Sequence, residues 1–205
     1  MAGRPQKYDL DDLLDRAVDL IWQQGPLALS LNEIATRLDL SKPALVRWFG
    51  GKEEFLATVL RRYHRRLDAP VRTALAEAKT VEETARGYLQ AYVTVLSEKP
   101  VGPATGCLLA ATTEAYAARR ESLMLDTAAD LNLQTRAALE QALTRTGAKD
   151  PQNLAEYLYG QSVALAFLSR GGAKAPALND FLERALKGAV GSIANGANPK
   201  APSID

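Results

Sequence analysis

Helical periodicity is the sequence feature that most constrains the fold of this 205-residue chain. Apolar residues recur at three- and four-residue spacing in almost every segment, which places them on one face of a helix. The first such stripe contains Leu10, Leu13, Leu14, Ala17, Leu20 and Ile21. The sequence has no alternating β-branched run and no Asn-Gly turn between two strand-like segments. It therefore predicts an all-α protein.

Glycine, proline and capping residues divide this pattern into separate helices. The expected helices lie between Asp9 and Gly25, from Ser30 to about residue 38, from Ser41 to Phe49, and over 52–67, 71–78, 81–98, 104–117, 121–146, 151–169 and 177–194. Residues 195–205 are expected to form a disordered tail.

Residues 30–49 have the pattern of a helix-turn-helix. Ser30 and Glu33 fit a capping box at the start of the first helix, and Ser41 is expected to cap the second. Between the helices, Asp39 stands where such turns often have glycine. Aspartate tolerates the left-handed backbone at modest cost, so the turn remains compatible with the motif.

The formal net charge is only +1, so attraction to nucleic acid has to come from a local group of charges. Between Ser41 and Lys52 the chain has cations but no acid, which suits a helix that approaches phosphates. A solvated cationic face is the alternative. The candidate DNA-contacting residues are Arg4, Ser30, Ser41, Lys42, Pro43, Ala44, Val46, Arg47, Trp48 and Lys52. Arg4 lies in a basic arm that can reach a minor groove or can simply be a frayed terminus.

The first third of the chain, from Gly3 to about Tyr63, resembles the DNA-binding domain of the tetracycline-repressor (TetR) family. The resemblance rests on Gly3-Arg4-Pro5, Trp22-Gln-Gln-Gly25, Ser30-Leu-Asn-Glu-Ile34-Ala35, Leu40-Ser41-Lys42-Pro43-Ala44-Leu45 and Phe49-Gly-Gly-Lys52-Glu53-Glu-Phe55. The chain departs from the family pattern at Val46, where a tyrosine is usual, so a phosphate-contacting hydroxyl is missing there.

The resemblance implies an all-α homodimer with an N-terminal three-helix helix-turn-helix domain and a C-terminal helical domain for ligand binding and dimerisation. We expect residues 1–51 to form the arm and DNA-binding domain, 52–67 a connecting helix, and 68–194 the effector-binding and dimerisation domain. The implied function is a ligand-responsive transcription regulator. We expect a repressor that a small-molecule effector releases from double-stranded operator DNA.

The C-terminal part contains two further sets of candidate residues. Aromatic and polar side chains on several helices can line an effector cavity or can be ordinary core residues. The candidate ligand-binding residues are Tyr88, Tyr92, Cys107, Tyr116, Tyr157 and Gln161. The apolar stripes of the last two helices can form a four-helix dimer interface or can pack inside the monomer. The candidate dimer-interface residues are Leu158, Leu165, Leu178, Leu182 and Leu186.

Cys107 is the single cysteine of the chain, which excludes an intrachain disulfide and suits a reducing cytoplasm. It lies near the start of an expected helix, where backbone N–H groups stabilise a thiolate. Gly106-Cys107-Leu108 also resembles the same place in some TetR-family members that sense electrophiles or oxidants. A thiol-based redox or electrophile-sensing regulator is therefore an alternative function, and a small buried apolar side chain is the simpler interpretation of Cys107.

The sequence contains little material for catalysis. His64 is the only histidine, and residues 46–53 do not fit a phosphate-binding loop. We therefore expect neither enzymatic activity nor a cofactor or metal. No apolar run is long enough to span a bilayer and no signal peptide is evident, which predicts a cytoplasmic protein. The resemblance to the TetR family implies a bacterial one. A helical interaction module that does not bind DNA remains a further alternative.

Overall fold

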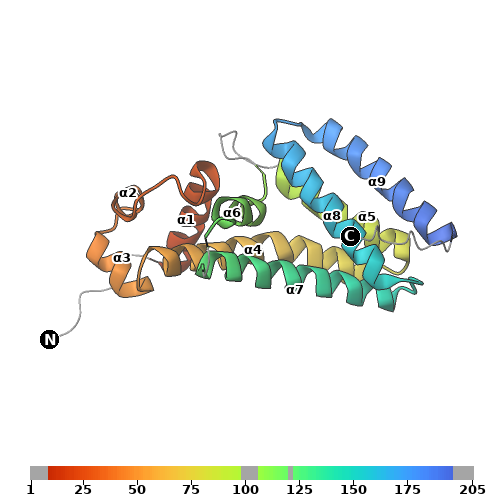
Figure 1. Cartoon of the computed structure of the whole chain (residues 1–205), viewed down its shortest axis with the longest axis horizontal. Helices are drawn as coiled ribbons and strands as arrows, with labels where there is room; N and C mark the ends of the chain where they lie inside the picture. The colour runs from red at the N-terminus through yellow and green to blue at the C-terminus, as the bar shows by residue number, and fades with distance from the viewer. Residues whose placement is uncertain (1–8, 98–105, 120–121, 196–205) are drawn as a thin grey trace.

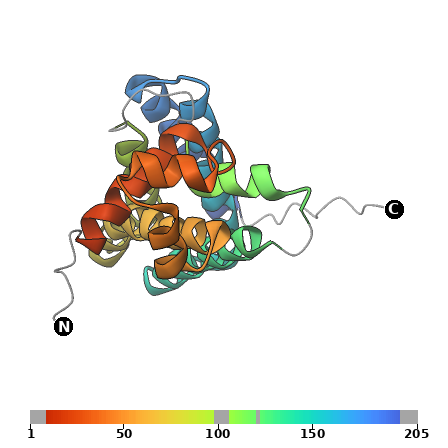
Figure 2. The ribbon, with the colours of Figure 1, turned by 90° about the vertical axis from the view of Figure 1, so that its left-hand side faces the viewer.

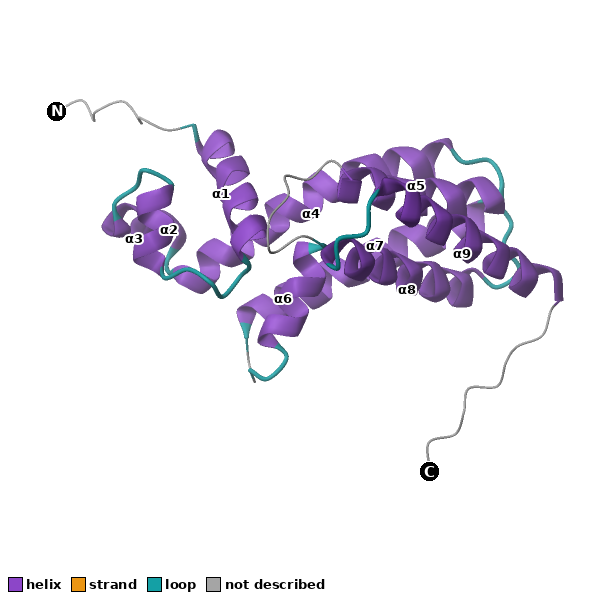
Figure 3. Ribbon diagram, turned by 90° about the horizontal axis from the view of Figure 1, so that it is seen from above, coloured by secondary structure: helices purple, strands orange, loops and turns teal. Residues whose placement is uncertain are grey.

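Nine helices and no strand are present in the part of the chain that the computed structural model describes, which is residues 9–97, 106–119 and 122–195 (Figures 1 and 3). The helices are α1 (Leu10–Gln24), α2 (Leu31–Arg37), α3 (Lys42–Phe49), α4 (Lys52–Glu77), α5 (Val81–Ser97), α6 (Leu108–Tyr116), α7 (Leu123–Arg145), α8 (Pro151–Arg170) and α9 (Ala175–Asn195). The all-α prediction is confirmed. The expected tail beyond Asn195 lies outside the described residues.

The helices form a small head, α1–α3, and a larger body, α5–α9, which share the long helix α4. The head lies at one end of the molecule, and α5, α8 and α9 lie at the other (Figure 1). Helices α4 and α7 run side by side between the two ends and pack on each other. Seen from the head, α6 extends to one side of the bundle (Figure 2). Buried apolar side chains from the head and the body belong to one continuous core.

Helix α4 continues through Pro70, so the expected division into helices at 52–67 and 71–78 is wrong. Proline inside a helix removes one backbone hydrogen bond and costs roughly 3 kcal/mol. Leu67 and Val71, on either side of Pro70, are buried in the core. Burial of two such side chains offsets a loss of this size. The 26 residues of α4 therefore continue across the domain boundary expected at residue 68, over about 39 Å.

Polar contacts fix α4 to α1 and to α7. Arg62 of α4 donates to Asp15 of α1 from Nε at 2.8 Å and from Nη2 at 2.6 Å, and its Nη1 lies 2.7 Å from Asp11. The hydrogen bonds from Arg62 hold the pKa of Asp15 below its usual value. Arg145 of α7 donates to two carbonyl oxygens at the C-terminal end of α4, where a helix lacks internal donors.

His64 is buried where α4 packs on α7. Its Nε2 lies 3.0 Å from Thr135 Oγ1, and that hydroxyl donates to the Leu131 carbonyl oxygen at 3.2 Å. Because a hydroxyl has a single proton, His64 is the donor in this pair. Burial lowers the pKa of His64, the charge of Asp68 partly opposes that shift, and Arg72 adds to it.

His64 should make the stability of the fold depend on pH. Because its folded pKa lies below 6.5, the unfolded chain binds the proton first as the pH falls, which destabilises the folded state. We expect the free energy of unfolding to decrease between about pH 7 and pH 5, and His64→Gln to flatten this dependence, since carboxylates titrate at lower pH. Urea unfolding at several pH values checks this. Equal pH slopes for the two proteins would contradict it.

Candidate functional site

The helix-turn-helix of residues 30–49 has the local structure that its sequence predicts. Ser30 Oγ accepts the Glu33 N–H at 3.3 Å, and a Glu33 carboxylate oxygen accepts the Ser30 N–H at 2.7 Å. These hydrogen bonds lower the pKa of Glu33. Asp39 has a φ of 58°, the left-handed conformation expected for the turn. A short connection therefore joins α2 to α3.

Helix α3 buries one face and exposes the other. Leu45 is fully buried, and the Phe49 ring packs edge to face on Phe55 of α4, with ring centroids 5.1 Å apart. Of the expected DNA-contacting residues, the exposed ones are Ser30, Ser41, Lys42, Pro43, Val46 and Arg47, and the half-buried ones are Ala44, Trp48 and Lys52. Arg4 lies outside the described residues. We call the exposed side of residues 41–47 the outer face of α3.

The outer face of α3 is cationic. Lys42 and Arg47 have no hydrogen-bond or ion-pair partner among the described residues. Ser41 Oγ accepts the Ala44 N–H at 3.3 Å, so its hydroxyl proton can still be donated to an outside acceptor. Lys52 is the first residue of α4, where helix N–H groups and the helix dipole favour an anion. These groups suit phosphates and guanine edges.

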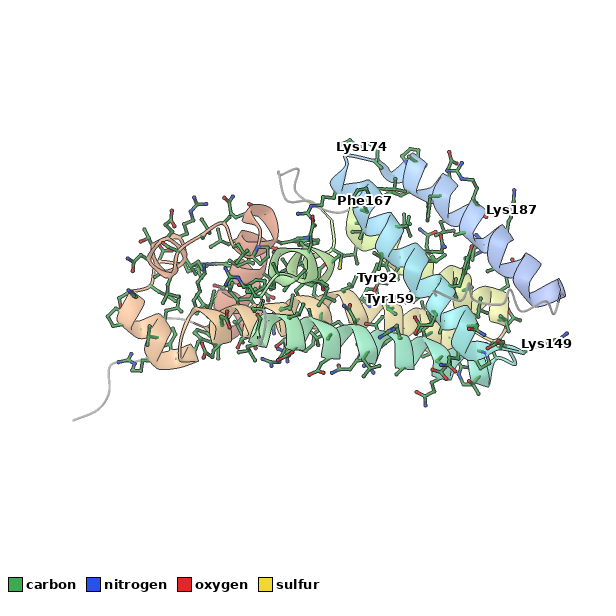
Figure 4. All side chains as sticks on the ribbon, viewed as in Figure 1. Tyr92, Lys149, Tyr159, Phe167, Lys174 and Lys187 are labelled. Carbon is green, nitrogen blue, oxygen red and sulfur yellow. The ribbon has the colours of Figure 1, made fainter. Side chains whose placement is uncertain are left out.

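Inside the body, tyrosine side chains gather around Cys107. Tyr88 Oη lies 3.1 Å from Ser162 Oγ, and the Tyr88 ring tilts against Tyr92 with centroids 5.1 Å apart. Helices α5 and α8, which carry Tyr92 and Tyr159, pack on each other, and both residues are labelled in Figure 4. Burial raises the pKa values of Tyr88, Tyr92 and Tyr159, and Cys107 adds to each shift. The phenols are therefore neutral at physiological pH.

Tyr63 of α4 is the member of this group with an unsatisfied hydroxyl. The side chain is fully buried. Its hydroxyl interacts with Cys107 and with the backbone of Leu108, yet it completes no hydrogen bond of normal geometry within the described part of the chain. Burial raises its pKa first, and Cys107 adds to the shift. We name the tyrosine cluster by its members, Tyr63, Tyr88, Tyr92, Cys107, Tyr159 and Ser162.

The tyrosine cluster contains three of the expected ligand-binding residues, Tyr88, Tyr92 and Cys107. Tyr157 instead donates to the Ala185 carbonyl oxygen of α9 at 3.0 Å. Tyr116 lies at the opposite end of α6 from Cys107 and packs under Arg119. Gln161 is half-buried on α8.

Sequence reasoning missed Tyr63 and Ser162. Tyr63 lies on the helix that was expected only to connect the two domains. Its spacing from the buried residues Leu60 and Leu67 marks it as a core position. That spacing does not reveal that its hydroxyl meets Cys107, which is distant in the sequence. Ser162 has no sequence signal, because its role comes from the Tyr88 hydroxyl beside it.

The expected dimer-interface leucines are buried inside the monomer, so this expectation needs correction. Leu158, Leu165, Leu178, Leu182 and Leu186 are all almost fully covered. Helix α9 packs on α5 and α8 of its own chain, which explains the apolar stripe of α9. The large apolar side chains that α8 exposes are instead Val163, Phe167 and Leu168, and Phe167 is 76% exposed.

A surface cleft of about 590 Å³ lies between α1 and α4. It is lined by Asp15, Asp19, Arg62, Arg65 and Arg66. Asp15 and Asp19 pair with arginines, so the cleft belongs to the joint between head and body.

Within residues 9–97, 106–119 and 122–195, no group of three or more His, Cys, Asp and Glu side chains could hold a metal ion. None of the helices described there combines the length and apolar character needed to cross a membrane.

The all-helical fold, the capped helix-turn-helix and the cationic outer face of α3 define a helix-turn-helix DNA-binding protein. Comparison with known sequences indicates the same class of protein. Residues 13–59 match the family model "Bacterial regulatory proteins, tetR family". The HTH-type transcriptional repressor ComR of Escherichia coli (strain K12) is 35% identical over 108 residues, which cover 52% of this chain and 50% of ComR. The match thus spans about half the length of this curated relative.

Solved structures share the fold over most of the chain. The TetR family transcriptional regulator CifR, as a cysteine mutant complexed with 26-bp operator DNA, superposes with a TM-score of 0.77 at 23% identity, covering 90% of this chain and 98% of that one. SCO4454, a TetR-family regulator from Streptomyces coelicolor, superposes with a TM-score of 0.76 at 14% identity, covering 89% and 94%. The chain is therefore similar to TetR-family regulators in the sequence of residues 13–59 and in the fold of its described part.

The capping box of α2 can be tested without DNA. Ser30→Ala should lower the free energy of unfolding by roughly 1 kcal/mol, because the Glu33 N–H loses its acceptor. Thr36→Ala is the matched control, since its hydroxyl donates only to the Asn32 carbonyl oxygen four residues earlier and such contacts contribute little. Urea unfolding compares the two variants. Equal stabilities would show that the capping box does not stabilise α2.

Proposed function

We propose that this protein is a dimeric repressor that binds double-stranded operator DNA and is released by a small-molecule effector. The observation that carries the proposal is the outer face of α3, where Lys42 and Arg47 are exposed and have no partner among the described residues. The relative ComR is named a repressor, and CifR of the same fold is bound to operator DNA. The proposed place of action is the bacterial cytoplasm, where an operator is accessible.

In the proposed complex, α3 lies in the major groove. Arg47 donates two hydrogen bonds to a guanine edge, and Ala44 and Val46 contact thymine methyl groups. The residues assigned to phosphate contacts are Ser30, Ser41, Lys42, Trp48 and Lys52, with Arg4 reaching an adjacent groove. Pro43 sits in the first turn of α3, where it starts the helix without losing a needed hydrogen bond.

The proposed dimer uses the exposed side of α8. Val163 and Phe167 lie four residues apart on this side, and Gly160 leaves open space above the helix. An aromatic side chain beside a small residue lets two copies of one helix approach closely about a twofold axis. Two α3 helices could then reach successive major grooves, about 34–36 Å apart.

The tyrosine cluster is the proposed effector site. Its aromatic rings and neutral hydroxyls suit a small molecule with an apolar body and a few polar groups. The Tyr63 hydroxyl lacks a normal hydrogen bond among the described residues, so it can form a hydrogen bond with the effector. Because Tyr63 belongs to α4, an effector that displaces it acts on the helix that carries the head. By linkage, operator DNA must weaken effector binding by the same factor.

A covalent effector is the second candidate. Cys107 is the N-cap residue of α6 and is only half-buried, so a small electrophile or oxidant can reach its sulfur. The unsatisfied Tyr63 hydroxyl beside it favours this candidate, because a phenol can donate a hydrogen bond to a thiolate or to the oxygen of an adduct.

Substitutions on α3 separate base reading from phosphate binding. Arg47→Ala should weaken operator binding by ~1–3 kcal/mol and relax base preference at one position, whereas Lys42→Ala should weaken binding to all sequences and reduce the salt slope by about one. Fluorescence anisotropy over a salt series measures both, with the DNA upstream of the protein's own gene and a random duplex of equal length.

Lys149→Ala is the control for these variants, because Lys149 is an exposed cation at the far end of the body (Figure 4). It should bind the operator as wild type does. If Arg47→Ala also binds like wild type, α3 does not read bases through Arg47.

A charged substitution on the exposed side of α8 tests the proposed dimer surface. Phe167→Asp should give a monomer, because two buried carboxylates would face each other across the twofold axis. Leu133→Asp is the control, since Leu133 is another exposed apolar residue but lies on α7. Sedimentation velocity reports the oligomeric state. A Phe167→Asp protein that remains dimeric would place the interface elsewhere.

A further inference from the structure

Trp22 links the head directly to the residue that precedes Cys107. Its indole Nε1 donates to the Gly106 carbonyl oxygen at 2.7 Å, in a buried hydrogen bond. Trp22 lies in the last turn of α1, just before the C-cap Gly25. This polar contact therefore joins the first helix of the head to the backbone at the start of α6.

A second contact joins Trp22 to the tyrosine cluster through side chains. The Trp22 and Tyr63 rings pack edge to face, with centroids 5.0 Å apart and planes inclined at 72°. The Tyr63 hydroxyl in turn interacts with Cys107. A group that enters beside Cys107 can thus reach Trp22 both through the Gly106 backbone and through the Tyr63 ring.

Gly106 has little room to absorb such a displacement by itself. Its φ is +114°, and a Cβ atom there would lie 3.0 Å from both the Ala166 carbonyl oxygen and Arg170 Cβ. The backbone before α6 is therefore held between α8 on one side and Trp22 on the other. In a closely packed interior, a shift at this point is transmitted to its neighbours because no void takes it up.

We propose that Trp22 is the coupling residue through which occupation of the tyrosine cluster at Cys107 changes the position of the DNA-binding head. This inference rests on the proposed effector-controlled operator binding. A group attached at Cys107 pushes on Tyr63 and on the Gly106 carbonyl, the indole hydrogen bond is broken or reoriented, and α1 moves relative to the body. The two heads of a dimer then no longer match the spacing of their half-sites.

The single cysteine allows this to be tested with a defined probe, methyl methanethiosulfonate. The Cys107 thiolate attacks the sulfenyl sulfur of the reagent, an S–S bond to the SCH₃ group forms, and methanesulfinate leaves with the bonding electron pair. Mass spectrometry confirms one added group per chain, and dithiothreitol removes it. Operator affinity is measured by anisotropy before labelling, after labelling and after reduction.

Labelling should weaken operator binding of the wild-type protein by about 5- to 150-fold, the usual range of allosteric coupling. Trp22→Phe keeps the aromatic contact with Tyr63 but lacks the indole donor to Gly106, so labelling should weaken its operator binding several-fold less than it weakens that of wild type. Tyr157→Phe is the matched control, because it also removes an aromatic donor to a backbone carbonyl. It should respond to labelling as wild type does.

An equal loss of affinity in wild type and Trp22→Phe overturns the proposal. The proposal is also overturned if fully labelled wild type binds the operator as tightly as the unlabelled protein. In that case, specific operator binding by the unlabelled protein still supports the proposed function. Failure of the unlabelled protein to prefer its operator overturns the proposed function and this inference together.

A fluorescence measurement does not depend on the stability of Trp22→Phe. In Trp48→Phe, Trp22 is the only tryptophan. Labelling at Cys107 should shift its emission to longer wavelength, because the indole leaves its buried hydrogen bond. An unchanged spectrum after full labelling overturns the proposal.

Discussion

The packing of α4 against both halves of the molecule is the constraint on which the rest of the structure depends. It contacts α1 and α3 in the head and α5, α6 and α7 in the body. Over the turns before Pro70 this helix resists bending, because each turn is hydrogen-bonded to the next. The head therefore moves as α4 moves, and side chains such as Tyr63 that project from α4 into the body can influence where α3 is held.

Charges within the head of this nearly neutral protein leave the outer face of α3 with cations and no acid. The acids of α1, including Asp15 and Asp19, pair with Arg62 and Arg66 of α4. Exposed ion pairs of this kind contribute little to stability. Their greater effect is on the field, because they neutralise carboxylates of α1 within the head, while Lys42 and Arg47 of α3 have no partner among the described residues.

The features that could be predicted from the sequence are those with local causes. The capping box at Ser30, the left-handed turn at Asp39 and the start of α3 depend on neighbouring residues, and all have the expected geometry. The features that were missed depend on tertiary packing. Pro70 remains helical because its neighbours are buried, and the role of Tyr63 depends on a residue far along the chain. The leucines of α9 form an apolar stripe, and periodicity alone does not show whether this stripe packs in the monomer core or against a second subunit.

Pro70 also bears on how the molecule opens locally. Proline cannot donate to the carbonyl oxygen of Arg66, so the helical hydrogen-bond ladder of α4 is interrupted at a single step in its C-terminal half. Cooperative unfolding units tend to end where such coupling is weakest. The cooperativity of α4 across this step therefore depends on side-chain packing, since Leu67 and Val71 are buried in the core on either side of it.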